Sequence, residues 1–318
     1  MKFKKIRKLI LLIGFGLLVA VLSKYGLTYV QYDIHSFSTK AIEATSDHNE
    51  LYKEINKKAD DYYVAPKNAH IDKVWKKTPG LTGRKVNVLK SYQKMKKKDT
   101  FDKEKLVYDR IPPKVTLEDL PAAPIYRGHP NKQAVSFLIN VSWGEEHIPD
   151  MLKTLEKHNV QATFFIEGKW ARKHKDYAKM IAEKGHTIGN HAFDHPDMAN
   201  LSQESAKKQI RQTNDILESL TDQKPKWFAP PSGSFNHETV KIAAAENMET
   251  ILWTVDTIDW KKPSTTVMNQ RVKEKLHPGA TILMHPTPVV KKGLDEMIRN
   301  VKKQHLSIVT IDTLLQEE

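Results

Sequence analysis

Two histidines four residues apart, His191 and His195, have the spacing in this sequence that is best suited to metal chemistry. On a helical turn, this spacing places both imidazoles on one face, close enough to bind a single cation. Neutral imidazole binds zinc and neighbouring transition metals, and a catalytic site combines about three protein ligands with an open position. The alternative is a pair of surface or packing histidines, because the chain has 14 histidines and such a pair arises readily by chance.

The position of this pair favours chemistry over packing. Residues 187–190 read as a short strand, so the histidines lie where a strand passes into a loop, which is where α/β folds build their sites. Other polar and aromatic groups also follow predicted strands: Asn140–Gly144, Ala229–Gly233, Asp256–Trp260 and His285–Pro286. We therefore expect all of these residues to meet on one rim.

Alternating short patterns from Ala134 onward must position that rim. The predicted strands are Ala134–Val141, Ala162–Ile166, Thr187–Asn190, Trp227–Ala229, Thr250–Thr254, Ala280–Met284 and Ser307–Thr310. The predicted helices between them are Ile148–His158, Lys169–Lys184, Ser202–Leu220, His237–Glu246, Ser264–Leu276 and Leu294–Lys303. About seven strands alternating with helices predict an α/β fold with a parallel sheet, closed or nearly closed into a distorted (β/α) barrel.

The net charge of +13 is concentrated in the N-terminal part of the chain. Residues 1–130 contain 26 Lys and Arg against 14 Asp and Glu, whereas residues 131–318 contain 25 against 24. The densest run, Lys94–Lys98, is typical of a solvated helix face, and it lacks the interleaved aromatic residues expected for nucleic-acid binding. An anionic membrane or cell-wall surface is therefore the expected partner, and nucleic acid is not.

The N-terminus has the pattern of an export signal. A basic head at residues 2–8 precedes an apolar run from Leu9 to Leu22, which Tyr25–Val30 extends. Without a convincing small-residue cleavage site, residues 1–30 are predicted to be an uncleaved signal anchor, with the rest of the chain outside the cytoplasm. Cleavage of a signal peptide and secretion is the alternative. The sequence has no cysteine, so a lipoprotein anchor and disulfides are excluded.

Residues 31–130 are predicted to form a helical stalk and a small basic α+β module. Residues 33–62 have a polar helical pattern, Lys85–Leu89 alternates like a strand, and Ser91–Lys98 has helical character. Prolines and a glycine in residues 121–130 indicate a linker. The catalytic-type domain is therefore expected to span residues 131–318. The sequence does not indicate an oligomeric state.

The ordered motifs resemble those of the polysaccharide deacetylases, the NodB-homology domain of carbohydrate esterase family 4, over residues 131–316. Asn190-His191 to His195-Pro196 matches the family's metal-binding motif, Trp253–Trp260 the fourth motif, and Leu283-Met284-His285 the fifth. Within the family, the sequence is similar to the YlxY-like sporulation branch of Gram-positive spore formers, which shares an N-terminal anchor and an extra module.

The resemblance implies a metal-dependent hydrolase of carbon–nitrogen bonds that removes acetyl groups from N-acetylglucosamine units of cell-wall glycan. It implies that His191 and His195 bind a divalent metal, zinc or a similar ion, and that His285 is the catalytic acid, oriented by Asp256 or Asp259. In the family, the metal activates water, a base takes that water's proton, and the acid serves the leaving amine. The implied substrate groove contains six residues: Trp143, Pro230, Pro231, Ser232, Trp260 and Leu283.

The first motif departs from the family pattern. The family has two adjacent aspartates, a base and then a metal ligand, where this sequence has Asn140 and Val141. An amide is not a useful proton acceptor, and valine cannot bind metal. The third motif has Ala229 in place of an arginine that steadies the base. This loss agrees with the loss of the base, because an arginine without its carboxylate partner would be an unpaired buried charge.

Three compensations are open: Glu145 or Glu146 as the base, Asp194 as a metal ligand, or water in the coordination shell. Two functions therefore remain. One is a deacetylase with an altered first motif, and the alternative is a catalytically inactive glycan-binding or scaffolding protein of the cell envelope.

Overall fold

The computed structural model describes residues 49–317, which belong to two compact units. The smaller unit contains residues 49–64 and 84–110, and the larger contains residues 65–83 and 111–317. This division differs from the boundary drawn at residue 130 from the sequence. The predicted anchor at residues 1–30 lies outside the described residues, and none of the helices described here has the length and apolar character needed to cross a membrane.

The smaller unit, which we call the basic module, packs two helices around a small apolar core. Its helices are α2 (Glu50–Lys58) and α3 (Val88–Met95), and its two-stranded sheet pairs β3 (Gly83–Val86) with β4 (Tyr108–Ile111). The predicted strand over residues 85–89 is too long, because the Asn87 side chain accepts a hydrogen bond from the backbone N–H of Lys90 and caps α3. The predicted helix over residues 91–98 consequently begins three residues earlier.

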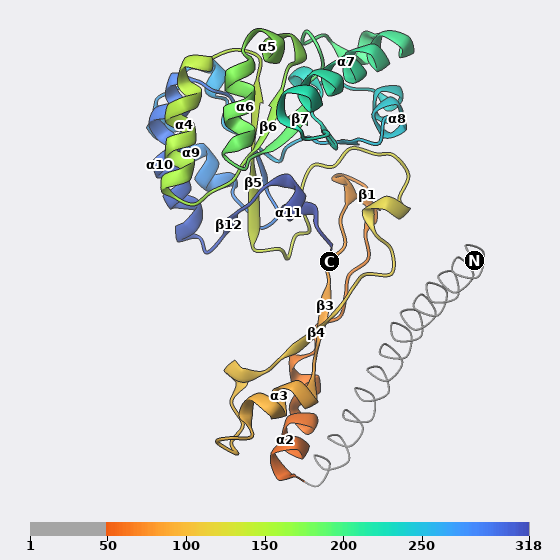
Figure 1. The fold of residues 1–318 in the computed structure, drawn as a ribbon, viewed down its shortest axis with the longest axis vertical. Helices are drawn as coiled ribbons and strands as arrows, with labels where there is room; N and C mark the ends of the chain where they lie inside the picture. The colour runs from red at the N-terminus through yellow and green to blue at the C-terminus, as the bar shows by residue number, and fades with distance from the viewer. Residues whose placement is uncertain (1–48, 318) are drawn as a thin grey trace, which may run out of the picture. The chain divides into compact units, whose positions relative to one another are not determined.

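The larger unit is built on a parallel sheet, as the alternating pattern predicts (Figure 1). Its strands are β5 (Ala134–Val141), β6 (Thr163–Ile166), β7 (Thr187–Asn190), β8 (Trp227–Phe228), β9 (Glu249–Thr250), β10 (Val255–Asp256), β11 (Thr281–Met284) and β12 (Ser307–Ile308). The order is β10-β11-β5-β6-β7-β8-β9, and β12 also pairs with β5. The result is a half-barrel whose two edge strands, β9 and β10, are not paired with each other.

The break between β9 and β10 corrects the single strand predicted over residues 250–254. A segment from the predicted linker lies at this edge instead: the Ile125 N–H donates to the Thr250 carbonyl, and the Leu252 N–H donates to the Ile125 carbonyl. The Ile125 side chain is fully buried. The hairpin of β1 (His70–Asp72) and β2 (Lys76–Thr78) belongs to the same unit, and Lys77 forms a 2.5 Å ion pair with Glu249 of β9.

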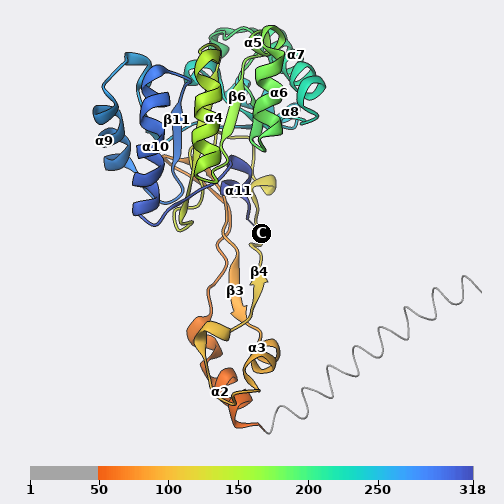
Figure 2. The same cartoon turned by 60° about the vertical axis from the view of Figure 1, so that its left-hand side comes forward.

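Helices flank the sheet in the βα order that the sequence predicts (Figures 1 and 2). They are α4 (Ile148–Lys157), α5 (Gly168–Lys173), α6 (Lys175–Glu183), α7 (Gln203–Thr221), α8 (His237–Ala245), α9 (Thr265–Lys275), α10 (Pro288–Lys303) and α11 (Ile311–Leu315). The single helix predicted over residues 169–184 is two helices, because His174 leaves the helical conformation with φ −119° and ψ 51°. Helix α10 begins six residues before its predicted start, and the Thr287 hydroxyl caps it by accepting from the Val290 N–H.

Side chains of β5 alternate between two apolar clusters and so fix which residues point into the barrel. Phe137, Ile139 and Val141 pack in the large cluster shared with α4 and α10, whereas Leu138 packs in the smaller cluster with Phe165. Because successive strand residues point to opposite faces, Asn140 lies on the same side as Leu138. The fully buried phenylalanines each contribute roughly 1.5–3 kcal/mol through removal of apolar surface from water.

Candidate functional site

The predicted rim forms at the carboxyl ends of the parallel strands. Residues 140–144 end β5, His191 follows β7, residues 229–233 follow β8, residues 256–260 follow β10, and His285 follows β11. In the spatial order of the sheet, β10, β11, β5, β6, β7 and β8 are consecutive neighbours, so the loops that follow them lie side by side.

His191 and His195 lie together as their spacing predicts. Their ring centroids are 5.2 Å apart with the planes at 73°. His191 is buried, and its Nδ1 lies 2.7 Å from the Ala229 carbonyl oxygen. Since a carbonyl only accepts, Nδ1 carries the proton and Nε2 keeps its lone pair, which is the tautomer a metal ligand needs. The loop between them is tightly turned, with φ of 60° at Ala192 and 58° at His195.

Burial keeps this pair uncharged at neutral pH. Desolvation, reinforced by the positive charge that His195 would carry, lowers the pKa of His191 to about 3. Desolvation also lowers the pKa of His195, and His285 lowers the pKa of both histidines. The three imidazoles therefore belong to one site. Two neutral imidazoles suit a divalent cation better than they suit an anion.

A complete metal site of the expected kind is not present. Among residues 49–317, no group of three or more His, Cys, Asp or Glu side chains could hold a metal ion. Val141, at the position expected for the metal-binding aspartate, is fully buried and belongs to the large apolar cluster. The site thus offers two nitrogen ligands where about three protein ligands are needed, and the described residues do not fit the expected metal on their own.

His285 and Asp259 form a hydrogen-bonded pair at the end of β11. His285 Nδ1–H donates to Asp259 Oδ1 over 3.0 Å, and the His285 backbone N–H donates to Oδ2 over 3.2 Å. Asp259 is completely buried, and it also accepts hydrogen bonds from the hydroxyls of Thr257 (2.8 Å) and Thr287 (3.0 Å). Four donors compensate the burial of this carboxylate, and they fix the imidazole with Nε2 as its free nitrogen.

Asp259, rather than Asp256, is the partner of His285. The sequence leaves the two aspartates as alternatives, and the structure separates their contacts. Asp256 Oδ1 accepts from the Ile258 backbone N–H at 2.8 Å and so stabilises the turn that leads to Asp259.

Three of the residues predicted to form the groove are exposed: Trp143, Ser232 and Trp260. The other three are buried: Pro230, Pro231 and Leu283. The exposed fractions are 47% for Trp143 and 52% for Trp260, which is unusual for a large aromatic side chain. One face of each ring is covered, by His285 at Trp143 and by Lys261 Nζ, 4.9 Å from the ring centre, at Trp260. The remaining exposed surface of each ring is open to a ligand. Buried members of the set can shape the groove only from behind.

The position of the expected base is occupied by an amide that lacks a partner. Asn140 is 4% exposed, and its Oδ1 atom is buried without a hydrogen bond. An unsatisfied buried acceptor costs roughly 1–3 kcal/mol, so Asn140 retains a cost that a purely structural position would not need. Ala229 is buried within the barrel, and its backbone carbonyl holds His191.

The candidate compensating carboxylates point elsewhere. Glu145 bonds to Trp170 Nε1 (3.3 Å) and His174 Nε2 (3.6 Å). Glu146 pairs with the neighbouring His147, and Asp194 accepts from Gln209 Nε2 at 2.7 Å. None of the three contacts the histidine pair, so the structure gives no support to these substitutes.

Glu167 is a site residue that the sequence reasoning missed. It directly follows β6, it is 8% exposed, and its backbone N–H donates to the Val141 carbonyl over 2.9 Å. Burial raises the pKa of its carboxyl. The sequence does contain a signal for Glu167, because it is a charged residue directly after the predicted strand 162–166. The other candidate residues were identified by the same criterion, their position after a predicted strand.

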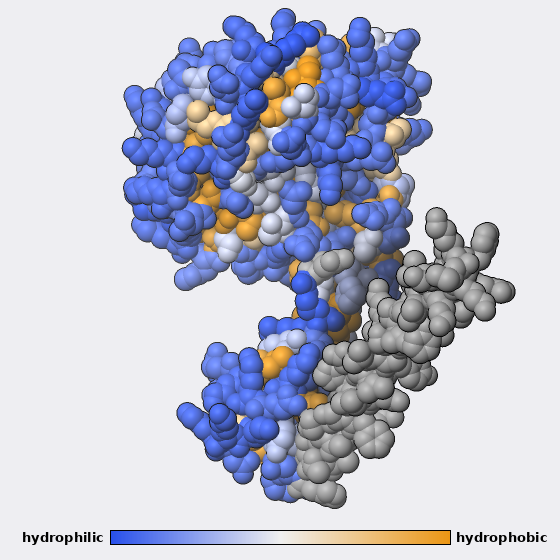
Figure 3. Space-filling model, in the orientation of Figure 1, coloured by the Kyte–Doolittle hydropathy of each residue, from blue (hydrophilic) through white to orange (hydrophobic). Residues whose placement is uncertain are grey.

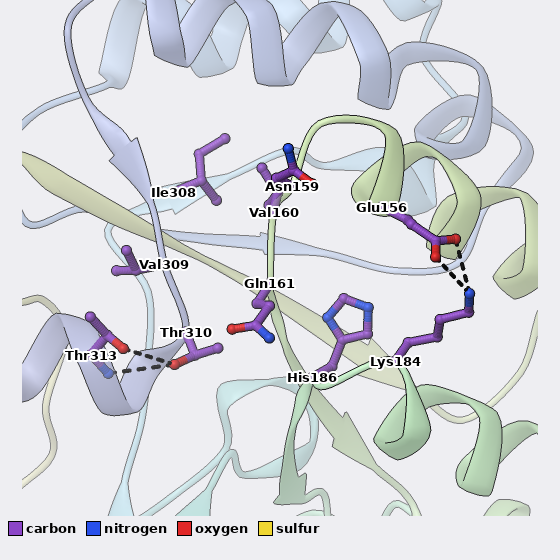
Figure 4. Close-up of a pocket in the computed structure, with 10 residues that line it drawn as sticks. All are labelled: Glu156, Asn159, Val160, Gln161, Lys184, His186, Ile308, Val309, Thr310 and Thr313. Atoms are coloured by element: carbon purple, nitrogen blue, oxygen red, sulfur yellow. Dashed lines mark hydrogen bonds and ion pairs between the residues drawn. The ribbon is translucent and has the colours of Figure 1, made fainter.

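A pocket of about 360 Å³ opens at the other end of the strands (Figure 4). Its lining includes Val160 and Gln161, which precede β6, and Lys184 and His186, which precede β7. Because the strands are parallel, this pocket lies at the edge opposite to the rim. Lys184 and Glu156 neutralise each other at its mouth over 2.9 Å, and none of the predicted site residues lines it.

The chain matches the polysaccharide deacetylase family over residues 127–251. It is 46% identical over 284 residues to the uncharacterized protein YlxY of Bacillus subtilis, and the match covers 89% of each chain. It is 34% identical over 196 residues to a peptidoglycan-N-acetylglucosamine deacetylase of Bacillus cereus, covering 60% of this chain and 71% of that protein.

Among solved structures, a carbohydrate esterase family 4 pseudoenzyme of Bacillus anthracis superimposes with a TM-score of 0.80 at 51% identity. The match covers 84% of this chain and 95% of that one. A variant of the same B. anthracis protein is described as having restored enzymatic activity, and it matches with a TM-score of 0.80 at 50% identity, over 84% of this chain and 98% of the variant.

Proposed function

Because this chain belongs to the polysaccharide deacetylase family, we propose that its barrel binds N-acetylated cell-wall glycan and that the hydrolytic step has been lost. The observation that carries the proposal is the pair Asn140 and Val141. A buried amide and a fully buried aliphatic side chain stand where the family needs a proton acceptor and a metal-binding carboxylate. The part of the site that would act on the leaving group is intact, and the part that would activate water is not.

Binding of glycan is supported by the open aromatic rings at the rim. Trp143 and Trp260 each keep an exposed apolar ring surface beside the one that His285 or Lys261 covers, and such surfaces bind the flat, partly apolar faces of sugar rings while hydroxyls stay in water. The names of two relatives agree with this proposal: the B. cereus protein is a peptidoglycan deacetylase, and the B. anthracis protein is a pseudoenzyme.

A second candidate, slow deacetylation, is favoured by the preserved His285–Asp259 pair. A binding protein has no need of a completely buried carboxylate that orients an imidazole through its Nδ1 atom. A protonated Nε2 of His285 would be able to donate to the leaving amine of an acetylated sugar. What this candidate lacks is a group to take the proton of the attacking water. Glu167, two residues beyond the Phe165 that pairs with Asn140, is the buried carboxyl at the end of the neighbouring strand β6.

We place the protein at the outer face of the cytoplasmic membrane, held by residues 1–30. The support is the basic head, the apolar run and the missing cleavage site in the sequence. Cell fractionation followed by sequencing of the mature N-terminus tests this placement, because a soluble product that begins near Lys24 would instead indicate secretion.

The proposed function is tested by measuring binding and acetate release together. The full chain, in detergent micelles, should bind chitotetraose in calorimetry while releasing no acetate above the rate of a His285→Ala variant. Trp143→Ala should weaken binding about 2- to 10-fold, since an aromatic contact contributes about 0.5–1.5 kcal/mol. Trp75→Ala is the matched control, because Trp75 is also partly exposed but lies in the turn between β1 and β2.

Two results would overturn the binding proposal. One is the absence of any Trp143-dependent binding to acetylated oligosaccharide. The other is steady acetate release that His285→Ala abolishes, which would establish the second candidate. A Glu167→Gln variant would then show whether this buried carboxyl supplies the missing base.

A further inference from the structure

The basic module has more basic residues than its acidic residues can neutralise. Residues 49–64 and 84–110 contain 13 Lys and Arg against 8 Asp and Glu. The surface of the module that is visible in Figure 3 is mostly hydrophilic. An unpaired charge of this size on a small unit attracts polyanions over roughly a Debye length, which is about 8–10 Å at ordinary ionic strength.

The excess is concentrated in one stretch that follows α3. Four lysines lie between residues 94 and 98, all exposed: Lys94, Lys96, Lys97 and Lys98. None of the four forms an ion pair with any described residue. Lys94, in the last turn of α3, is explained by the favourable interaction of a cation with a helix C-terminus. The same interaction accounts for Lys96, the C-cap residue of α3, whereas Lys97 and Lys98 lie beyond the cap and have no such explanation.

A cleft of about 470 Å³ lies beside this stretch. Seven residues line it: Tyr62, Lys98, Thr100, Phe101, Asp102, Lys103 and Lys105. Its one carboxylate, Asp102, is 3.7 Å from Lys105, which leaves Lys98 and Lys103 to set the charge of the cleft. Within residues 49–317, Lys103 forms an ion pair only with the adjacent Glu104, at 4.0 Å, and both side chains are strongly exposed, so this contact contributes little.

We propose that this cleft of the basic module binds a phosphodiester polymer of the cell wall, a chain of polyol units joined by phosphates. Lysine ammonium groups bind phosphate as compact point charges, whereas carboxylates are better recognised by arginine forks, and no arginine lines the cleft. Lys98, Lys103 and Lys105 line the cleft together, and Lys96 and Lys97 precede Lys98 in the chain, so the stretch offers more cations than a single phosphate needs. The choice of a wall polymer rests on the proposed cell-envelope location, but the charge argument does not.

The aromatic residues of the cleft argue against nucleic acid. Single-stranded nucleic acid binds through bases stacked on open aromatic faces. Here, Lys58 Nζ lies 4.1 Å from the centre of the Phe101 ring, and Tyr62 packs against the same ring with centroids 6.4 Å apart. Lys58 thus covers one face of Phe101, and the two aromatic rings of the cleft pack against each other instead of standing apart as separate stacking surfaces for successive bases.

A membrane surface is also a poorer fit than a polymer. Peripheral membrane attachment combines basic residues with apolar side chains that enter the interface. In the cleft, both aromatic side chains are only partly exposed, and the residues around them are lysines, a threonine and an aspartate. A concave, lysine-lined surface accommodates a flexible chain better than a flat sheet of headgroups.

The test is a titration of the full chain with fluorescent poly(glycerol phosphate), followed by anisotropy at about 50 mM and about 200 mM salt. We expect binding that weakens as salt rises, because phosphate contacts release counterions. The double variant Lys98→Glu/Lys103→Glu should weaken binding at least about tenfold and reduce the salt dependence. Both side chains are exposed, so circular dichroism and the melting temperature should stay unchanged.

Lys53→Glu/Lys85→Glu is the matched control, because it changes the net charge equally on exposed lysines of the module that do not line the cleft. Equal weakening by the two double variants would reduce the effect to overall charge and overturn the proposal. Tighter binding to phosphatidylglycerol vesicles or to a single-stranded oligonucleotide than to the polymer would also overturn it. Chitotetraose binding should be identical in all variants, which separates this result from the proposed glycan function.

Discussion

The indole of Trp143 and the imidazole of His285 lie almost parallel, with an interplanar angle of 10° and ring centroids 5.9 Å apart. The two residues come from the loops after β5 and β11, which are neighbours in the sheet. Gly144 makes their approach possible: its φ is +81°, and a Cβ atom there would lie 2.1 Å from the Pro286 carbonyl oxygen. An exposed tryptophan of the expected groove and the histidine at the position expected for the acid therefore form one unit.

Gly144→Ala should separate this stacked pair. The methyl group cannot fit against the Pro286 carbonyl, so one loop must move, and chitotetraose affinity should fall at least as much as in Trp143→Ala. Gly185→Ala is the control, because it imposes the same backbone strain at φ +78° but meets only the flexible Gln161 side chain. Both variants should lose about 1 kcal/mol or more of unfolding free energy. Calorimetry should show reduced glycan affinity only in Gly144→Ala, and equal affinities would show that the stack is not used in binding.

Asp259→Asn should destabilise the larger unit far more than Asp256→Asn. The amide of asparagine introduces an NH₂ group among donors that all need an acceptor, namely the hydroxyls of Thr257 and Thr287 and the N–H groups of His285. A loss of about 1–3 kcal/mol is expected for such unsatisfied buried groups. Asp256→Asn keeps the single bond to Ile258 and should change stability little. Urea unfolding monitored by tryptophan fluorescence compares the two, and equal effects would contradict the assigned network.

Restoring the two lost carboxylates should make stability depend on zinc. In Asn140→Asp/Val141→Asp, the second substitution places a charge in a fully buried apolar position, so without metal the double variant should be less stable than wild type by several kcal/mol. Zinc bound by His191, His195 and the new carboxylate should recover that loss. Acetate release should rise about a hundred- to ten-thousand-fold over wild type.

Wild type provides the comparison for this variant. With two nitrogen ligands only, it should bind zinc at micromolar or poorer affinity, and His191→Ala should abolish that binding. Melting curves with and without zinc should therefore coincide for wild type and differ for the double variant. Tight zinc binding by wild type would show that a third protein ligand joins the histidines in solution.

Stability should fall as the pH drops from 6.5 toward 4, in part because of His186. Its buried Nδ1 accepts from the Ala162 N–H at 3.1 Å, and burial, with a contribution from Lys184, lowers its pKa to about 4. Because the unfolded chain binds a proton here more readily, the contribution is complete above about pH 6.5 and is lost as the pH falls through the folded value. Between pH 7 and pH 5 the loss should be about 2 kcal/mol.

His186→Asn supplies the control for this pH dependence. The Asn Oδ1 can take the place of Nδ1 as acceptor but does not titrate. Urea unfolding at pH 7 and pH 5 should therefore show a smaller difference in this variant than in wild type. An unchanged difference would assign the pH dependence to other groups.

Periodicity predicted most of the barrel because the sheet is parallel and buried. The boundaries of β5 and β7 agree with the predicted strands, and the helices that follow β5, β7 and β8 begin within one residue of their predicted starts. The positions of His191, His195 and His285 after predicted strands also predicted that they lie in one site, since the carboxyl ends of parallel strands share an edge.

What the sequence could not show depends on tertiary contacts. The stretch 250–254 is apolar and β-branched like a strand, but its hydrogen bonds are divided among three partners. The Ile251 N–H donates to Phe228 of β8 and the Thr254 N–H donates to Thr281 of β11, whereas Thr250 and Leu252 bond to Ile125. The choice between Asp256 and Asp259 required knowing which carboxylate lies beneath the imidazole. Glu167 could have been found from its place after a predicted strand, whereas the Phe101–Lys58 contact in the basic module has no local sequence signal.

The Ile125 segment has a consequence for how the protein can be divided. A chain cut at residue 131, as the sequence boundary would advise, loses the backbone that covers Thr250 and Leu252, together with the hairpin that holds Lys77 against Glu249. Its β9 edge would then present unpaired N–H and C=O groups, a template for intermolecular strand addition. The larger unit is therefore discontinuous in sequence, and a fragment meant to isolate the barrel must begin at or before residue 65, with residues 84–110 of the basic module between its two parts.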